Sequence, residues 1–247
     1  MTSFALLIGL GASLGLWQVA RTTPEEQTGS WVDAGLGVLA GMLLGARAAY
    51  VALHPAYYAA HPGEWYRLWM GGYSAAGAVA GGLLAAGIAA LLMRTSFPGL
   101  LDAISPLFPP LVVLGWLGCA AVGCGYGPEM GLGSWLAVPV PDEWGQVMAR
   151  FPLQFGAALI FLVYNWIIAA VLPGRSFPGQ RAALVGLGLA GVQFSAALLS
   201  AEPVPLWRGL SYEAWASLGL GIFSLLLGIY AFWPRDNLPR RHREKPF

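Results

Sequence analysis

Seven long apolar segments limit the folds that this sequence can adopt. They fall at approximately residues 4–20, 31–53, 71–93, 107–124, 152–172, 182–200 and 214–233. A helix needs about 20 mostly apolar residues to cross the hydrocarbon core of a bilayer. Only 10% of the residues are charged, against about 25% in soluble domains. The sequence therefore predicts an all-α integral membrane protein with seven transmembrane helices.

The distribution of basic residues predicts how these helices are oriented. Nine of the 13 Lys and Arg residues fall on one side of the predicted bundle, three on the other, and Arg47 inside a span. Because cytoplasmic loops are enriched in basic residues, we expect the N-terminus outside and the C-terminus in the cytoplasm. Residues 1–233 would form a single membrane domain and residues 234–247 a basic cytoplasmic tail. The larger group comprises Arg21, Arg94, Arg175, Arg181, Arg235, Arg240, Arg241, Arg243 and Lys245, and the smaller one Arg67, Arg150 and Arg208.

Net charge and histidine content restrict the classes of ligand. The formal net charge is +1, so we expect no nucleic-acid partner. The chain has three histidines, which gives little support for a metal site. His54 and His61 fall in a proline-bearing aromatic segment, residues 54–72, that is typical of a membrane interface. We expect a short arm on the outer surface with both imidazoles exposed; ligation of a pigment, haem or metal is the alternative.

Three connecting segments carry most of the remaining charge. Residues 95–110 contain four prolines and Asp102, which predicts a cytoplasmic-side turn rather than a continuous helix. Residues 125–151 form the largest predicted outer segment. The connection after the sixth span brings Glu202, Arg208 and Glu213 to the outer interface, where we expect solvated charges.

The two cysteines of the chain, Cys119 and Cys124, both fall in an apolar run. Residues five apart on a helix point about 140° from one another. On a continuous helix they would form neither a disulfide nor a pair of metal ligands. We therefore expect two buried small residues.

Glycines at four-residue spacing occur in the first three predicted helices. Such spacing allows helix backbones to approach closely in lipid, so we expect a compact bundle, with homo-oligomerisation as the alternative. Gln154 and Asn165 are expected to make polar contacts between helices. The spaced glycines are Gly11 and Gly15, then Gly37, Gly41 and Gly45, then Gly77 and Gly81.

Five short motifs follow one another in a fixed order. Gly45–Tyr50 reads GARAAY, and residues 71–82 read GGYSAAGAVAGG. Asp102–Pro106 reads DAISP, and Arg150–Gln154 reads RFPLQ. Between these two, residues 115–127 read GWLGCAAVGCGYG, with glycines at 115, 118, 123 and 127 and tyrosine at 126.

This order of motifs resembles the prolipoprotein diacylglyceryl transferase family, whose members move a diacylglyceryl group from phosphatidylglycerol to a lipoprotein cysteine. The corresponding family patterns are G-[AG]-R-x-x-Y, G-G-L-S-F-H-G-G-x-x-G-G, D-x-x-A-P, R-H-P-x-Q and the signature G-R-x-G-N-F-x-N-G-E-x-Y-G. A later family pattern, R-F-x-x-E-x-x-R, falls on residues 193–200 of this sequence, QFSAALLS. The resemblance runs from about Gly37 to Trp233. It implies a transferase-like bundle of seven helices in the bacterial inner membrane.

The chain departs from the family where the family carries histidine, arginine, asparagine or glutamate. At those positions it has apolar or small polar side chains: Ala76, Trp116, Cys119, Val122, Cys124, Phe151, Gln193 and Ala197. Transfer to a thiol needs a base that generates the thiolate and cations that hold the phosphate. These side chains supply neither, so the leading expectation is a catalytically degenerate relative.

Such a relative would serve as an accessory subunit of a larger membrane complex, in contact with other membrane proteins, or as a lipid-binding protein. No cofactor is required, although a cavity between the helices could hold a lipid chain, quinone, carotenoid or chlorophyll. The alternative is a divergent active transferase that uses Arg47 and Arg150 to bind lipid phosphate, together with outer carboxylates such as Glu129. Arg47 could equally be a structural arginine that is paired internally or reaches the interface.

Overall fold

The computed structural model describes residues 2–131, 134–141, 145–172 and 177–232. Within these ranges, seven helical segments are long and apolar enough to cross a membrane, which confirms the predicted helical class. The predicted tail, residues 234–247, lies outside the described residues. Six of these segments correspond to α1 (Thr2–Thr22), α2 (Thr28–Leu53), α4 (Ala75–Leu92), α7 (Leu153–Val171), α8 (Gln180–Leu199) and α9 (Tyr212–Phe232). The remaining one, Phe97–Val122, ends with α6 (Phe108–Val122).

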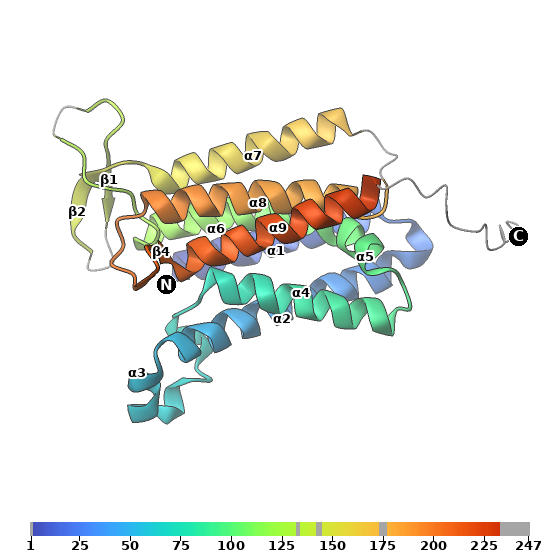
Figure 1. Cartoon of the computed structure of the whole chain (residues 1–247), viewed down its shortest axis with the longest axis horizontal. Coiled ribbons are helices and arrows are strands. Elements are labelled where there is room, and N and C mark those ends of the chain that lie inside the picture. The colour runs from blue at the N-terminus through green and yellow to red at the C-terminus, as the bar shows by residue number, and fades with distance from the viewer. Residues whose placement is uncertain (1, 132–133, 142–144, 173–176, 233–247) are drawn as a thin grey trace, which may run out of the picture.

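These helices run side by side, and α1 begins and α9 ends at opposite ends of the bundle (Figure 1). We call the end where α2 finishes and α4 begins the arm end, because residues 54–74 project from it as an arm. The arm contains α3 (Pro55–Ala60) and two 3-10 turns, η2 (Pro62–Glu64) and η3 (Leu68–Met70). A third such turn, η1 (Glu25–Gln27), connects α1 to α2. Which end faces outward stays a prediction.

Two short antiparallel strand pairs also lie at the arm end (Figure 1). β1 (Val138–Pro141) pairs with β2 (Val147–Arg150), with Val138 opposite Arg150. β3 (Leu206–Trp207) pairs with β4 (Leu210–Ser211) immediately before α9. The strands described in these connections can therefore position side chains.

The predicted turn at residues 95–110 is wrong. The segment forms α5 (Phe97–Ile104) and a 3-10 turn, η4 (Ser105–Leu107), that continues into α6. Each of these three elements has proline at its first or second position. A proline there removes an N–H that has no partner within the helix, so it starts a helix instead of breaking one.

The short helix α5 contributes several side chains to the buried core. Its fully buried Leu100 and Ile104 pack with Val38 of α2, Ala86 of α4 and Leu227 of α9. The Asp102 carboxylate accepts hydrogen bonds from the backbone N–H groups of Gly179 (2.7 Å) and Ala182 (2.8 Å). These bonds satisfy free donors at the start of α8 and attach α8 to α5.

Close contact between α2 and α4 confirms the predicted packing for Gly41, Gly45, Gly77 and Gly81, but not for Gly37, where a Cβ would meet no atom within 4 Å. A Cβ placed on Gly81 would lie 2.2 Å from the carbonyl oxygen of Gly41, and one on Gly77 would lie 2.4 Å from that of Gly45. On α1, a Cβ on Gly15 would lie 2.5 Å from the carbonyl oxygen of Leu107. Only glycine permits these approaches.

Large apolar side chains cover the outside of the bundle. Leu159, Ile160 and Trp166 on α7, and Leu91 and Leu92 on α4, are all exposed. An apolar surface of this extent suits a hydrocarbon surrounding rather than water. The molecule is a multi-pass membrane protein.

Candidate functional site

Arg47 of α2 is buried and fixes the arm to the bundle. Only 4% of the residue is exposed. Nε donates to the carbonyl of Trp65 (3.1 Å), and Nη2 donates to that of Glu64 (2.7 Å). Nη1 donates to the carbonyls of Gly71 and Gly72. These contacts match the interpretation of Arg47 as an internally paired structural arginine.

The aromatic arm carries the two histidines predicted to be exposed, and both are exposed. The His54 ring stacks on Tyr50 with centroids 4.2 Å apart, and His61 stacks on Tyr57 at 4.6 Å. The Tyr57 hydroxyl donates to the Glu64 carboxylate at 2.8 Å, and this bond raises the pKa of Tyr57 above its usual value of 10.0. Such contacts give the arm a defined shape.

The expectation that Cys119 and Cys124 are two buried, unlinked residues is wrong. They form a disulfide, with Cα atoms 4.6 Å apart, and both residues are partly exposed. The helix α6 ends at Val122, and Gly123 has a left-handed φ of 77°. This turn brings Cys124 back over the last turn of α6, so the angle between positions on a continuous helix does not apply.

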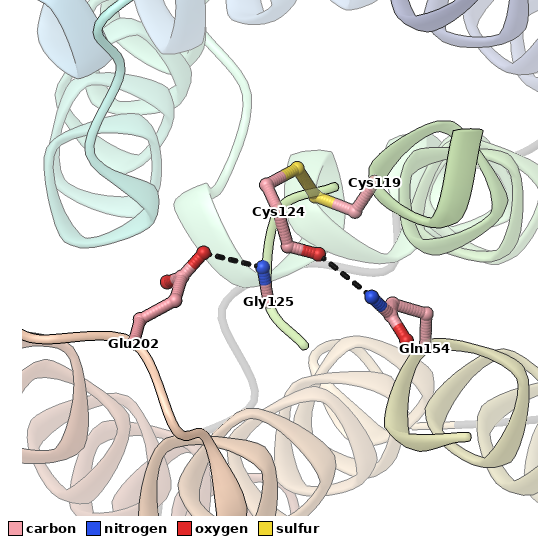
Figure 2. Close-up of a disulfide and its surroundings, with 5 residues drawn as sticks. All are labelled: Cys119, Cys124, Gly125, Gln154 and Glu202. Atoms are coloured by element: carbon pink, nitrogen blue, oxygen red, sulfur yellow. Dashed lines mark hydrogen bonds between the residues drawn. A yellow bond between two sulfur atoms is a disulfide. The ribbon is translucent and has the colours of Figure 1, made fainter. Parts of the chain in front are cut away.

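Residues 123–127, which we call the signature loop, are held by side chains from two other elements (Figure 2). Glu202, in the connection after α8, accepts the backbone N–H of Gly125 at 2.6 Å. Gln154 of α7 donates through Nε2 to the carbonyl of Cys124 at 3.0 Å. The loop therefore lies at the meeting point of α6, α7 and the α8–α9 connection.

Gln154 is fully buried, with 0% of its surface exposed. Its Oε1 has no hydrogen-bond partner among the described residues. The predicted interhelical contact is confirmed for Gln154, because it joins α7 to the loop that follows α6. It is wrong for Asn165, whose amide donates to the carbonyl of Phe161 within the same helix.

Arg150 lies beside the signature loop and is buried against Tyr126. Its guanidinium carbon is 4.4 Å from the centroid of the Tyr126 ring. Nη1 lies 3.5 Å from the carbonyl oxygen of Gly127, and Nη2 lies 3.5 Å from Oε1 of Glu129. The Arg150 side chain is 6% exposed, whereas that of Glu129 is 57% exposed. The pair thus joins a buried cation to an accessible carboxylate.

The local backbone explains why Arg150 points to this loop. Arg150 ends β2, where it pairs with Val138 on one side and forms an isolated bridge with Glu129 on the other. A Cβ on Gly127 would lie 2.6 Å from the carbonyl oxygen of Phe151. Glycine at position 127 therefore allows the chain leaving α6 to pass directly against the chain that enters α7.

A second carboxylate at the arm end holds the start of α4. Glu213 accepts the Ser74 hydroxyl at 2.8 Å and the Ala76 backbone N–H at 2.7 Å. Glu202 and Glu213, predicted to be solvated charges, are thus both bonded to backbone N–H groups, and each is only partly exposed. Arg208 is exposed as predicted.

The remaining predicted positions are distributed over the same end of the bundle. Trp116 lies against the signature loop, because a Cβ on Gly125 would be 3.0 Å from its ring. Gln193 and Ala197 lie in the last two turns of α8. The structure thus places Trp116, the disulfide and Arg150 at the signature loop. Arg47 is bonded to the backbone of the arm instead. The described residues contain no group of three or more His, Cys, Asp or Glu that could hold a metal ion.

An apolar cavity of about 90 Å³ lies between α2, α4, α5, α8 and α9. Small-molecule sites usually occupy roughly 300–1,000 Å³. In this conformation the cavity is too small for a quinone, carotenoid or chlorophyll. Its lining includes Val38, Ala86, Leu101, Phe108, Val185 and Phe223.

Comparison with known proteins gives a consistent result. The model of the family described as "Prolipoprotein diacylglyceryl transferase" matches residues 1–230. The chain is similar to the phosphatidylglycerol–prolipoprotein diacylglyceryl transferase of Nitratidesulfovibrio vulgaris, at 28% identity over 92% of this chain and 85% of that protein. The enzyme of the same name from Cupriavidus metallidurans is 25% identical over 93% and 88%. That of Bacillus licheniformis is 34% identical over 42% of this chain and 39% of the relative.

These relatives contradict the expectation of a catalytically degenerate accessory or lipid-binding protein, because each carries the name of an active transferase. That expectation rested only on the side chains at the positions matched to the family patterns. The structure places Arg150, Glu129, Glu202 and Glu213 at this end of the bundle, so charged groups are present there.

Seven apolar helices and bacterial relatives of this kind identify a multi-pass protein of the bacterial inner membrane. The match covers nearly the whole described bundle, and the chain belongs to the prolipoprotein diacylglyceryl transferase family.

Proposed function

We propose that this chain transfers the diacylglyceryl group of phosphatidylglycerol to the cysteine thiol of a prolipoprotein. Relatives that align with more than nine tenths of the chain are named for this reaction. The observation that carries the proposal is the buried Arg150, held against Tyr126 and beside the accessible Glu129. The reaction needs a cation to bind the phosphate and a base to accept the thiol proton, and these two side chains are neighbours.

The reaction forms a bond between the cysteine sulfur and a glycerol carbon, breaks the bond from that carbon to a phosphate oxygen, and releases glycerol phosphate. The thiol must lose its proton before it attacks, because the thiolate is the nucleophile. Negative charge develops on the departing phosphate oxygen. A fixed cation at that oxygen lowers the barrier.

Arg150 is proposed to bind the phosphate of the lipid. Its guanidinium is restrained by the Tyr126 ring and by the carbonyl of Gly127, so little reorganisation is needed on binding. Arginine suits this role because its planar group can donate two parallel hydrogen bonds to a phosphate. The 3.5 Å contact with Glu129 is long enough for a phosphate oxygen to compete for the same nitrogen.

Glu129 is proposed to accept the proton of the thiol. Its carboxylate is exposed, and its Oε1 lies 3.5 Å from Nη2 of Arg150. A carboxylate released by phosphate binding can act as a general base toward a neighbouring thiol. Arg47, in contrast, donates to four backbone carbonyls, and we propose that it shapes the arm rather than binding phosphate.

The test uses purified protein in phosphatidylglycerol vesicles with a lipoprotein-signal peptide, and mass spectrometry of the peptide. We expect Arg150→Gln to lower the transfer rate by about 100-fold or more, as the loss of a charge-stabilising donor does in other enzymes. Arg150→Lys should retain part of the rate, because lysine keeps the positive charge but lacks the planar group that donates two parallel hydrogen bonds. The matched control is Arg208→Gln, since Arg208 is an exposed arginine at the same end of the bundle.

Glu129→Gln should also slow transfer, and its exposed position means that the fold tolerates the change. An Arg150→Gln protein that is folded and as active as the Arg208→Gln control would contradict the role of Arg150. Full activity of Glu129→Gln would exclude Glu129 as the base. If all of these proteins, including the wild type, failed to transfer the group, the proposed function itself would be contradicted.

A further inference from the structure

We propose that the Cys119–Cys124 disulfide is a redox-sensitive positioning element for the site around Arg150. When oxidised, it holds the signature loop in the conformation that supports Arg150, and reduction by a dithiol releases the loop. The link to lipid binding rests on the proposed function; the effect on the loop does not.

The disulfide joins the last turn of α6 to the loop that leaves it. Cys119 lies within α6, and Cys124 follows the left-handed Gly123. Gly125, on the other side of Cys124, also has positive φ, 61°. Two glycines give this segment more backbone freedom than any other residues would. The covalent link between Cys119 and Cys124 restrains that freedom.

Every described residue of the loop from position 124 to 127 makes a contact that depends on the loop's position. The carbonyl of Cys124 accepts Gln154, and the N–H of Gly125 binds Glu202. The next two residues, 126 and 127, supply the ring and the carbonyl that contact Arg150. A displacement at position 124 is therefore transmitted within three residues to the guanidinium.

The link is accessible to a reductant, because both cysteines are partly exposed. They are the only cysteines in the sequence, so any direct effect of a thiol reductant on this chain acts through them. A dithiol reductant would donate two electrons and two protons to the bond. The products are the Cys119 and Cys124 thiols and the cyclic disulfide of the reductant.

Hydrogen exchange tests the loop directly and needs no catalytic activity. We would compare the oxidised wild type, the wild type treated with dithiothreitol, and Cys119→Ala/Cys124→Ala, all in the same detergent. Backbone exchange in peptides covering residues 123–127 should become about tenfold faster on reduction, as expected when a local constraint is lost. The double variant should exchange as fast as the reduced wild type and should not respond to the reductant. Peptides from α2 and α4 serve as internal controls.

Kinetics test what the loop positions. If the loop supports Arg150, reduction should lower kcat/KM for phosphatidylglycerol by about three- to tenfold, because this ratio reports the transition-state stabilisation that the arginine provides. Reoxidation should restore the original kcat/KM. The double variant should show the lowered kcat/KM with or without dithiothreitol.

Equal exchange at residues 123–127 in the oxidised and reduced protein would overturn the proposal. A faster loop with an unchanged kcat/KM would also overturn it, because the disulfide would then be a structural link only. Absence of transfer in the oxidised wild type would instead count against the proposed function, and the exchange data alone would then decide whether the disulfide restrains the loop.

Discussion

At the scale of single residues, two carboxylates at the arm end, those of Glu202 and Glu213, bind backbone N–H groups. Glu213 accepts both the Ser74 hydroxyl and the Ala76 N–H at the start of α4. The first N–H groups of a helix have no partner within it, and an ionised acceptor there also interacts favourably with the helix dipole. Glu213 thus joins the first turn of α9 to the first turn of α4.

Glu213→Ala should lower the free energy of unfolding by about 1–3 kcal/mol, the usual cost of losing hydrogen bonds to a charged group. Glu213→Gln should cost less, because the amide oxygen still accepts one of the two bonds. Unfolding in detergent, followed by circular dichroism, measures the change. Glu26→Ala at the exposed Glu26 of η1 is the control, and equal stability of Glu213→Ala and this control would contradict the capping role.

Residue types alone predicted part of the site. The motif pattern singled out Arg150 and Gln154, and the structure brings both to the signature loop. The roles of Glu202 and Glu213 were missed because sequence does not reveal which backbone N–H groups a distant carboxylate will meet. The disulfide was missed because α6 ends at Val122, before Cys124, and the left-handed Gly123 turns the chain back. The apolar sequence pattern continues past this point without a break.

At the scale of elements, the sequence pattern predicted the spanning helices well and one connection poorly. Apolar length identifies a spanning helix because the bilayer thickness sets that length. Residues 95–110 were misjudged because proline disfavours a helix interior but favours its first turn. The segment contains three such first turns, those of α5, η4 and α6.

The crossing of α2 and α4 provides a matched pair of glycine substitutions. Gly81→Ala should destabilise the protein by about 1–3 kcal/mol, the usual cost of overpacking, because its Cβ would lie 2.2 Å from the Gly41 carbonyl oxygen. Gly87→Ala lies on the same helix, and a Cβ there would meet no atom within 4 Å, so it should change stability by no more than about 0.5 kcal/mol. Thermal unfolding in detergent measures both. Equal midpoints for the two variants would show that the close approach at Gly81 contributes nothing.

At the scale of the whole molecule, a bundle of apolar helices presents its polar chemistry at one end. The arm, the two strand pairs, the signature loop and the described residues around Arg150 and Glu213 all lie where α2 ends and α4 begins (Figure 1). Charge inside a bilayer is costly, roughly 2.5–3.5 kcal/mol per side chain on insertion scales. The charged side chains that bind a headgroup therefore cost less free energy at the end of the bundle than at its centre.

We propose that this family member transfers diacylglyceryl groups. The most direct test is mass spectrometry of a reporter prolipoprotein from bacteria depleted of their own transferase and expressing this chain. We expect a reporter that carries one diacylglyceryl group in thioether linkage on its cysteine, and an unmodified reporter in cells that express Arg150→Gln. An unmodified reporter in cells that contain correctly inserted wild-type protein would contradict the account.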